Sequence, residues 1–359
     1  MNDPMSISTN ENIARSALEK KRAPRNRTLT LSAEEQTKYS QNLLALNSPV
    51  SLDAVCNRVI HQDALEALSF LPDSCADLVI VDPPYNKNQQ FNSDRFTRTS
   101  ADQYQAWVDL WLGMLSSKMK DSASIYICSD WQSSAAIQHA ASRYFKIQNR
   151  ITWEREKGRG ALRNWKNCSE DIWFCTKSED YVFNVDAVKL SRRVIAPYRN
   201  LDGAPKDWDE TEYGNFRLTH PSNLWTDITV PFWSMPENTE HPTQKPEKLI
   251  AKLILASSRP GDLVLDPFAG SGTTAVVAKK TDRQFLAIEK DNIYCCLAQK
   301  RLDFAETDRS IQGYANGVFL ERNTAVQQKQ RFQWQSEREG AGNSQSGLFL
   351  LNQKGIDNE

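Results

Sequence analysis

One stretch of this sequence, an apolar run that stops at two prolines, constrains the fold most. Residues 78–86 read LVIVDPPYN, and four apolar residues in a row indicate a buried strand. The two prolines hold the backbone extended after the strand, so no helix can begin there. The sequence therefore predicts a strand that delivers a rigid polar loop to the edge of a sheet.

This loop carries hydrogen-bond acceptors without local donors. Neither Pro83 nor Pro84 has an N–H group, so the Asp82 carboxylate and the Pro83 carbonyl need donors from elsewhere. A ligand amino group would supply two donors, and the ring of Tyr85 offers a flat face for stacking on a heterocycle. The alternative is a plain exit from a strand, with Asp82 as a cap.

The residues before the loop predict a parallel sheet. Residues 57–63 (NRVIHQD) read as a short strand that ends in Asp63, and leucines at helical spacing follow in residues 64–74. A strand, a helix and a second strand in this order indicate parallel pairing, with ligand groups gathered at the carboxyl ends of the strands. We therefore expect Asp63 and Asp82 to face the same crevice.

A second strand–helix–strand unit carries a glycine turn. The strand 261–266 (GDLVLD) leads into PFAGSGTT, and the strand 284–289 ends in Glu289, 19 positions past Gly270. Gly270 and Gly272 would let the backbone approach a nucleoside, and Glu289 would accept its ribose hydroxyls. The spacing Gly270-x-Gly272-x-x-Ala275 also satisfies the dinucleotide-binding pattern of nicotinamide enzymes. The loop at Asp82 argues against hydride transfer, because it offers acceptors for an amine but no proton relay.

Composition limits the remaining classes. The 359 residues carry a net charge of −1, which argues against wholesale coating of nucleic acid but allows a local basic face. Neither the seven cysteines nor the four histidines have metal-ligand spacing, so we expect reduced thiols and no metal site. No apolar run approaches the length of a membrane span, and the first residues lack a signal-peptide profile, so we expect a cytoplasmic protein.

Composition shifts divide the chain into five parts. We expect a polar, partly basic arm at 1–50, a catalytic half at 51–185, an irregular inserted module at 186–240, a cofactor half at 241–305 and a polar extension at 306–359. The arm is either solvated or a tail that touches phosphates, and the charged run after residue 154 is either a solvated loop or a phosphate grip. The candidates for contacts with phosphates or base edges are Arg155, Lys157, Arg159, Arg163, Arg192, Arg193 and Arg217.

Three motifs together resemble a known family. DPPYN at 82–86, HPTQKP at 241–246 and FAGSG at 268–272 occur in the order of the β-group DNA amino-methyltransferases of restriction–modification type. The resemblance spans about residues 57–305. It implies an α/β, Rossmann-like S-adenosylmethionine-dependent methyltransferase fold with a seven-stranded mixed sheet and one antiparallel strand. It also implies a permuted motif order, with the catalytic half first, and a target recognition region at 186–240.

The resemblance also implies roles for individual residues. Asp82 and the Pro83 carbonyl, held by Pro84, would accept hydrogen bonds from an exocyclic amine, and Tyr85 would stack on a flipped base. The residues implied to hold the cofactor are Asp266, Phe268, Gly270 and Gly272 at the methionine and sulfonium part, Glu289 at the ribose, Asp63 at the adenine, and Thr243, Gln244 and Lys245 at the amino-acid end. The alternative for the last three is a helix-capping turn.

These implications predict a site-specific enzyme that methylates N6 of a flipped adenine in double-stranded DNA, with S-adenosylmethionine as the donor. Asp ahead of Pro-Pro-Tyr favours adenine within the family, and N4 of cytosine is the first alternative. An RNA or protein amino methyltransferase and a catalytically silent DNA-binding module are further alternatives. A cognate restriction endonuclease would share the site, and the chain would act as a monomer or a homodimer.

Overall fold

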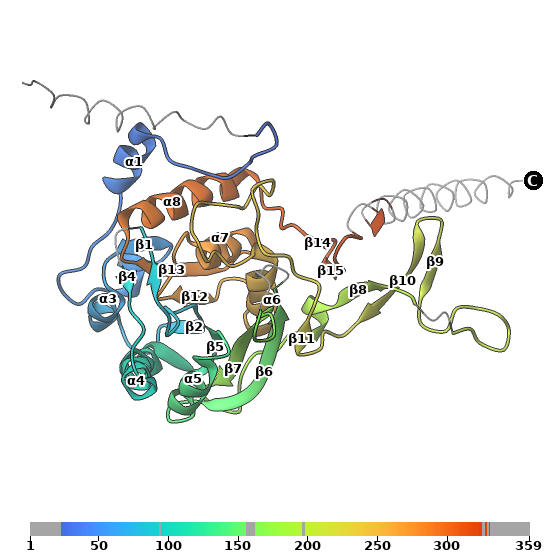
Figure 1. Ribbon diagram of the computed structural model, residues 1–359, viewed down its shortest axis with the longest axis horizontal. Coiled ribbons are helices and arrows are strands. Elements are labelled where there is room, and N and C mark those ends of the chain that lie inside the picture. Colours follow the sequence, from blue (N-terminus) through green and yellow to red (C-terminus); the bar gives the residue numbers. More distant parts are fainter. Residues whose placement is uncertain are drawn as a thin grey trace, which may run out of the picture.

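The structure is a computed structural model that describes residues 23–92, 95–155, 162–195, 198–324, 327, 328 and 330. Its body is an eight-stranded sheet flanked by helices (Figure 1). The strand order is β1 (Arg58–His61), β13 (Gln284–Glu289), β12 (Leu263–Asp266), β2 (Ala76–Val81), β5 (Met119–Ser129), β7 (Ser169–Thr176), β6 (Lys146–Glu154) and β11 (Leu224–Trp225). Only β7 runs antiparallel to its neighbours. The predicted fold class is confirmed, and the inserted module adds β11 as a short eighth strand.

Alternating side chains on each strand make two cores. On β2, Leu78 and Ile80 pack into one core, while Val79 and Val81 pack into the other. The first core contains α6 (Glu247–Ser257), α7 (Thr273–Lys280) and α8 (Asn292–Thr307), and the second contains α3 (Ala64–Phe70), α4 (Ala101–Lys118) and α5 (Ser134–Ala141). Both faces of the sheet are therefore covered, which explains why central strands such as β2 and β12 read as nearly continuous apolar runs. None of the described helices is long and apolar enough to cross a bilayer.

The described part of the N-terminal arm is packed against the body. Residues 33–40 form α1 (Ala33–Ser40), which begins with a capping box between Ser32 and Glu35. Tyr39 donates a hydrogen bond to Asp303 of α8 at 2.8 Å, and Lys300 of α8 pairs with Glu35 at 2.5 Å. Residues 23–50 thus differ from the solvated arm that the polar composition indicated.

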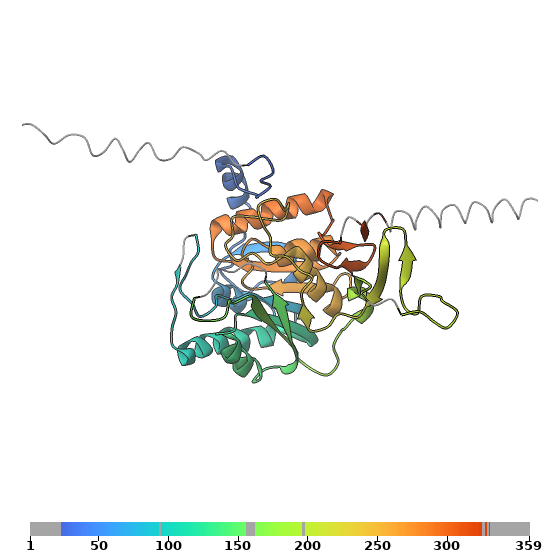
Figure 2. The same cartoon turned by 45° about the vertical axis from the view of Figure 1, so that its right-hand side comes forward.

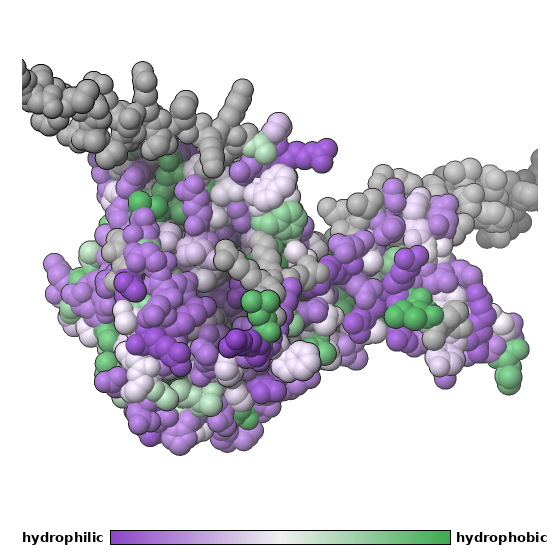
Figure 3. Space-filling model, viewed as in Figure 1, coloured by the Kyte–Doolittle hydropathy of each residue, from purple (hydrophilic) through white to green (hydrophobic). Residues whose placement is uncertain are grey.

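A second sheet projects from the body and joins segments that are far apart in sequence (Figures 1 and 2). Its strand order is β14 (Tyr314–Ala315), β15 (Val318–Leu320), β8 (Leu190–Arg193), β10 (Gly214–Thr219) and β9 (Asp209–Thr211). Strands β14 and β15 come from the predicted polar extension. Figure 3 shows the projecting part as mostly hydrophilic on the face in view, with isolated hydrophobic patches. The second sheet is therefore built from strands within residues 190–219 together with residues 314–320, whereas β11 of the same predicted module belongs to the main sheet.

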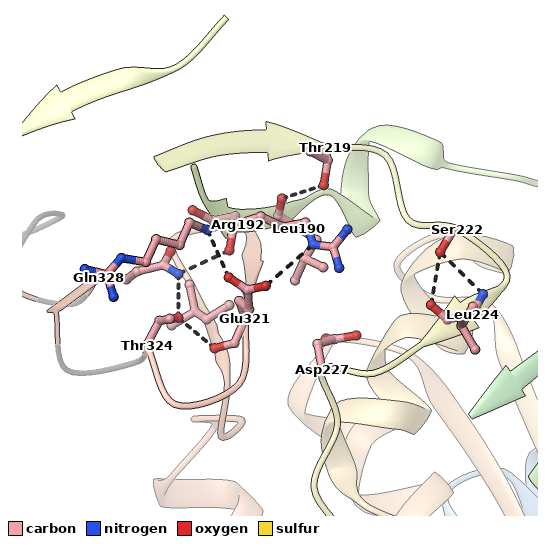
Figure 4. A network of polar contacts seen from close by, with 12 residues as sticks. Leu190, Arg192, Thr219, Ser222, Leu224, Asp227, Glu321, Thr324 and Gln328 are labelled. Atoms are coloured by element: carbon pink, nitrogen blue, oxygen red, sulfur yellow. Dashed lines mark hydrogen bonds and ion pairs between the residues drawn. The ribbon is translucent and has the colours of Figure 1, made fainter. Parts of the chain in front are cut away.

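Polar contacts fasten the C-terminal segment to this sheet (Figure 4). Glu321 accepts a hydrogen bond from the Arg193 backbone N–H at 3.0 Å and lies 3.7 Å from the Arg192 guanidinium. Gln328 donates to the Ser191 carbonyl at 3.1 Å and to Thr324 at 2.7 Å. Glu321 and Gln328, which follow β15, therefore help to hold β8 in the second sheet.

Candidate active site

A cavity of about 290 Å³ opens where the carboxyl ends of β2, β12 and β13 meet. It joins the two halves of the chain, because its walls carry the acceptor loop after β2 and the glycine turn after β12. Twelve of the residues predicted for the site line it: Asp63, Asp82, Pro83, Pro84, Tyr85, Thr243, Gln244, Lys245, Asp266, Phe268, Gly270 and Glu289. Its volume lies at the lower end of the range for small-molecule sites.

The acceptor loop is held rigidly at the cavity wall. Tyr104 of α4 donates a hydrogen bond to the Pro84 carbonyl at 3.0 Å, and the Asn86 N–H binds the Ser133 hydroxyl at 3.0 Å. In the described part of the chain, no group donates to the Pro83 carbonyl. Pro83 lines the cavity, and its carbonyl as an acceptor for a ligand stays a prediction.

Both oxygens of Asp82 have partners. The Tyr85 hydroxyl donates to Oδ1 at 2.8 Å, and the Lys245 ammonium donates to Oδ2 at 2.5 Å. Tyr85 is only 5% exposed, and the ammonium groups of Lys245 and Lys87 lie 5.4 and 5.1 Å from its ring centroid. Stacking of a base on this ring would require one of these lysines to move aside.

Lys245, expected at the amino-acid end of the cofactor, forms ion pairs within the protein. Its ammonium lies 2.5 Å from Asp82 Oδ2 and 3.4 Å from Glu170 Oε2. Burial alone would lower the pKa of Lys245, but the two carboxylates raise it above its ordinary value. The Lys245 side chain is therefore protonated and bound to the acceptor loop through Asp82.

Glu170 is a site residue that the sequence did not identify. It stands near the beginning of β7 with a side chain 4% exposed, and it forms ion pairs with Lys245 and with Arg155. Because β7 is antiparallel, its amino end meets the same edge as the carboxyl ends of the parallel strands. Arg155, expected to contact DNA, is thus paired with a buried carboxylate.

The glycine turn is shaped by packing. Gly270 and Gly272 have φ angles of +52° and +76°, which side chains other than glycine rarely adopt. A Cβ on Gly270 would lie 2.8 Å from His241 Nε2, and one on Gly272 would lie 2.5 Å from the Cβ of Ala298 in α8. Gly270 lines the cavity, whereas Gly272 is not among the lining residues and serves the contact of the turn with α8.

Three acids that are predicted to contact the cofactor line the cavity. Glu289 accepts hydrogen bonds from the Gly270 and Asp291 N–H groups, both at 2.8 Å, and burial raises its pKa. Burial likewise raises the pKa of Asp266 to about 7, despite a hydrogen bond from the Phe268 N–H. Asp63 caps α3 by accepting from the Leu65 N–H at 3.0 Å. The described residues include no cluster of His, Cys, Asp and Glu that could hold a metal ion.

The segment before α6 holds its own turn. The Gln244 side chain accepts from Thr239 and donates to the Glu237 carbonyl at 2.7 Å, while the Thr243 N–H binds His241 Nδ1 at 3.4 Å. These contacts hold the turn but do not cap α6 directly, because the Glu247 N–H donates to Glu237 Oε2 at 2.6 Å, and the Gln244 side chain also lines the cavity. On the opposite wall, Phe268 packs against Trp107 and Trp111 at centroid distances of 6.0 and 5.7 Å.

The remaining basic candidates that the structure describes are not among the residues that line the cavity. Arg192 is 3.7 Å from Glu321, Arg217 is 3.4 Å from Asp207, and Arg193 is exposed on β8. Arg163 is exposed in the loop before β7, while Lys157 and Arg159 fall outside the described residues. The acidic partners of Arg192 and Arg217 offset part of the positive charge of the surface around them. Their contact with DNA stays a prediction.

Comparisons with known proteins match this chain to DNA methyltransferases. A family profile described as DNA methylase matches residues 76–300. The DNA adenine methyltransferase YhdJ of Escherichia coli is 34% identical over 254 residues, which cover 69% of this chain and 83% of that protein. The type II methyltransferase M.HpaI of Haemophilus parainfluenzae is 31% identical, with 68% and 74% covered. Among solved structures, the cytosine-N4-specific PvuII DNA methyltransferase gives a TM-score of 0.51 at 17% identity, with 71% of this chain and 87% of that chain covered.

Proposed function

Because this chain belongs to the N6/N4 DNA methylase family, we propose that it transfers a methyl group from S-adenosylmethionine to N6 of a flipped adenine in double-stranded DNA. The observation that carries the proposal is the position of Asp82 and the Pro83 carbonyl in one cavity with Asp266, Gly270 and Glu289. Adenine is favoured by Asp82 ahead of Pro-Pro-Tyr and by the name of the relative that is 34% identical. N4 of cytosine is the second candidate, since it presents the same kind of amine.

The acceptor loop explains how an unreactive amine can attack. The lone pair of an exocyclic amine is delocalised into its ring, so the nitrogen must become pyramidal first. Asp82 and the Pro83 carbonyl accept hydrogen bonds from its two N–H groups out of the ring plane, and these bonds stabilise the developing ammonium. Bound S-adenosylmethionine supplies the electrophilic methyl group. Phe268 lines the cavity, and its ring would stabilise the sulfonium by a cation–π contact if the two lie face to face.

The duplex must open for this chemistry. The amine of a paired base is unreachable, so the nucleotide flips out at a cost of roughly a few kcal/mol. Stacking of the base on Tyr85 would recover part of this cost once Lys87 moves aside. Asp82 then serves as acceptor for the released proton. A covalent adduct with the protein is unnecessary, because the amine itself is the nucleophile.

The projecting module is assigned to sequence recognition. Its position outside the α/β body and its long irregular loops support this role, and its sheet is completed by β14 and β15. A chimera that receives both residues 186–240 and residues 306–324 from a relative should therefore methylate the relative's site. Exchange of 186–240 alone should give an unstable or inactive module. A chimera that keeps the original site would place recognition elsewhere.

Affinity for S-adenosylmethionine should depend on the ionisation of Asp266. Burial raises its pKa to about 7, and a nearby sulfonium or ammonium favours the carboxylate, so binding releases a proton below that pH. Affinity should rise by up to about tenfold per pH unit toward pH 7 and then level off. Calorimetric titration between pH 5 and 8 measures this. Asp266→Asn should bind more weakly and with a flatter pH dependence, whereas an equally steep curve in that variant would assign the proton to another group.

The reaction itself is tested by identifying the modified nucleoside. DNA incubated with the full chain and S-adenosylmethionine is digested to nucleosides and analysed by mass spectrometry. N6-methyldeoxyadenosine is the expected product, and N4-methyldeoxycytidine would establish the second candidate. Retention of DNA on a gel without either product would indicate a silent binding module. A partner endonuclease that cuts the same site, and whose activity methylation would block, stays a prediction.

A further inference from the structure

The Lys245 ammonium lies between two carboxylates, Asp82 of the acceptor loop and Glu170 of β7. The Lys245 Nζ lies 2.5 Å from Asp82 Oδ2 and 3.4 Å from Glu170 Oε2, and the Tyr85 hydroxyl lies 3.3 Å from the same Glu170 oxygen. The side chains of Lys245 and Glu170 are 7% and 4% exposed, so water screens their interaction poorly. Asp82 and Glu170 therefore compete for one buried cation.

This competition matters for the charge that Asp82 presents. A lysine bound to Asp82 alone would cancel its negative charge and occupy an oxygen that the target amine needs. With Glu170 included, the charge of Lys245 is shared between two carboxylates, so Asp82 keeps more of its negative charge for a developing ammonium. Arg155 pairs with Oε1 of Glu170 and leaves Oε2 directed at the lysine.

We propose that Glu170 is a positioning residue for methyl transfer: it draws the Lys245 ammonium away from Asp82, so that the Asp82 carboxylate accepts the target amine. The two lysine contacts differ by about 1 Å, so a small shift of the side chain exchanges one carboxylate for the other. The inference rests on the proposed function and adds to it a residue from β7 that is not among the residues lining the cavity.

The first test is Glu170→Gln, which keeps the shape of the side chain and removes its charge. Lys245 then stays on Asp82, and we expect kcat to fall about 100-fold. The Kd for S-adenosylmethionine, measured by calorimetry, should stay within about threefold, since the change touches the amine side of the cavity. Glu170→Asp retains the charge on a shorter side chain and should keep at least about tenfold more kcat than Glu170→Gln.

A second change distinguishes positioning from a structural role. Adding Lys245→Met to Glu170→Gln removes the cation that occupies Asp82, and kcat per folded molecule should recover at least about tenfold. Asp171→Asn is the matched control. Its carboxylate is next in sequence but is bound to the Ser134 hydroxyl at 2.8 Å on the other face of β7, so kcat should stay unchanged.

The outcomes separate clearly. Wild-type kcat in Glu170→Gln, equal losses in Glu170→Gln and Glu170→Asp, or a double variant that is folded but no faster than Glu170→Gln would each overturn the proposal. Folding of every variant is checked by its melting temperature and by binding of S-adenosylmethionine. If the wild type binds S-adenosylmethionine but methylates no DNA, the proposed function fails, and the role of Glu170 fails with it.

Discussion

Replacement of Asp82 by alanine is expected to lower kcat for methyl transfer by about 1,000-fold while the Kd for S-adenosylmethionine stays within about threefold. The reason is that Asp82 accepts a hydrogen of the amine and stabilises the charge that appears on the nitrogen, whereas the cofactor contacts other walls of the cavity. Transfer of labelled methyl groups to DNA measures kcat, and calorimetric titration measures the Kd.

The Asp82→Ala variant should remain folded. Lys245, which loses Asp82, still has Glu170 at 3.4 Å, so no buried ammonium is left without a carboxylate. Asp82→Asn provides the matched comparison, because it keeps an acceptor oxygen but removes the charge, and it should retain more activity than alanine. Normal turnover in either variant would refute the role of the carboxylate. A large rise in the Kd would instead place Asp82 against the cofactor.

The sequence predicted those parts of the site that local patterns specify. The apolar run at 78–81 located β2, and the acidic residues at its end and at the ends of β12 and β13 were placed correctly at the cavity, because parallel strands gather their carboxyl ends. The capping box at Ser32 and Glu35 was also present in the sequence as S-x-x-E. Its signal predicts α1, although the polar composition around it suggested a solvated arm.

Long-range pairing explains what the sequence did not reveal. Glu170 reaches the site because β7 is reversed, and a strand's direction relative to its neighbours has no local signature. Strands β8 and β15 are separated by more than 100 residues and are only three or four residues long, so their pairing could not be predicted from the sequence. The buried partner of Arg155 was hidden for the same reason, since only the fold brings Glu170 beside it.

The stability of the whole assembly should depend on Asp227. This carboxylate, 4% exposed, lies after β11 and pairs with two lysines on α6, Lys248 at 2.6 Å and Lys252 at 2.8 Å. Lys248 also donates to the Leu320 carbonyl of β15 at 2.6 Å, and Lys252 lies over the Trp225 ring. The cluster thus joins the body, β11 and the projecting module. Asp227→Asn should lower the free energy of unfolding by about 3–5 kcal/mol at pH 7, because two buried ammonium groups lose their only nearby carboxylate among the described residues.

The pH dependence identifies buried charge as the cause. Burial lowers the pKa of Lys248 to about 8 in the folded protein, even with Asp227 present, whereas in the unfolded chain it returns to about 10.4. The unfolded state therefore binds more protons between these values, and stability rises with pH across this window. Without Asp227, the pKa values of both lysines in the folded state fall further. The stability of Asp227→Asn should therefore begin to rise at a lower pH than that of the wild type, and the difference in stability between the two proteins should be smallest near pH 10.

Urea unfolding at pH 7 and pH 9.5 measures this difference. Asp186→Asn, which breaks an exposed ion pair with Lys189, is the control that should leave stability unchanged. A deficit that stays constant with pH would mean that Asp227 acts through its hydrogen bonds alone, and wild-type stability at pH 7 would mean that the lysines find other partners.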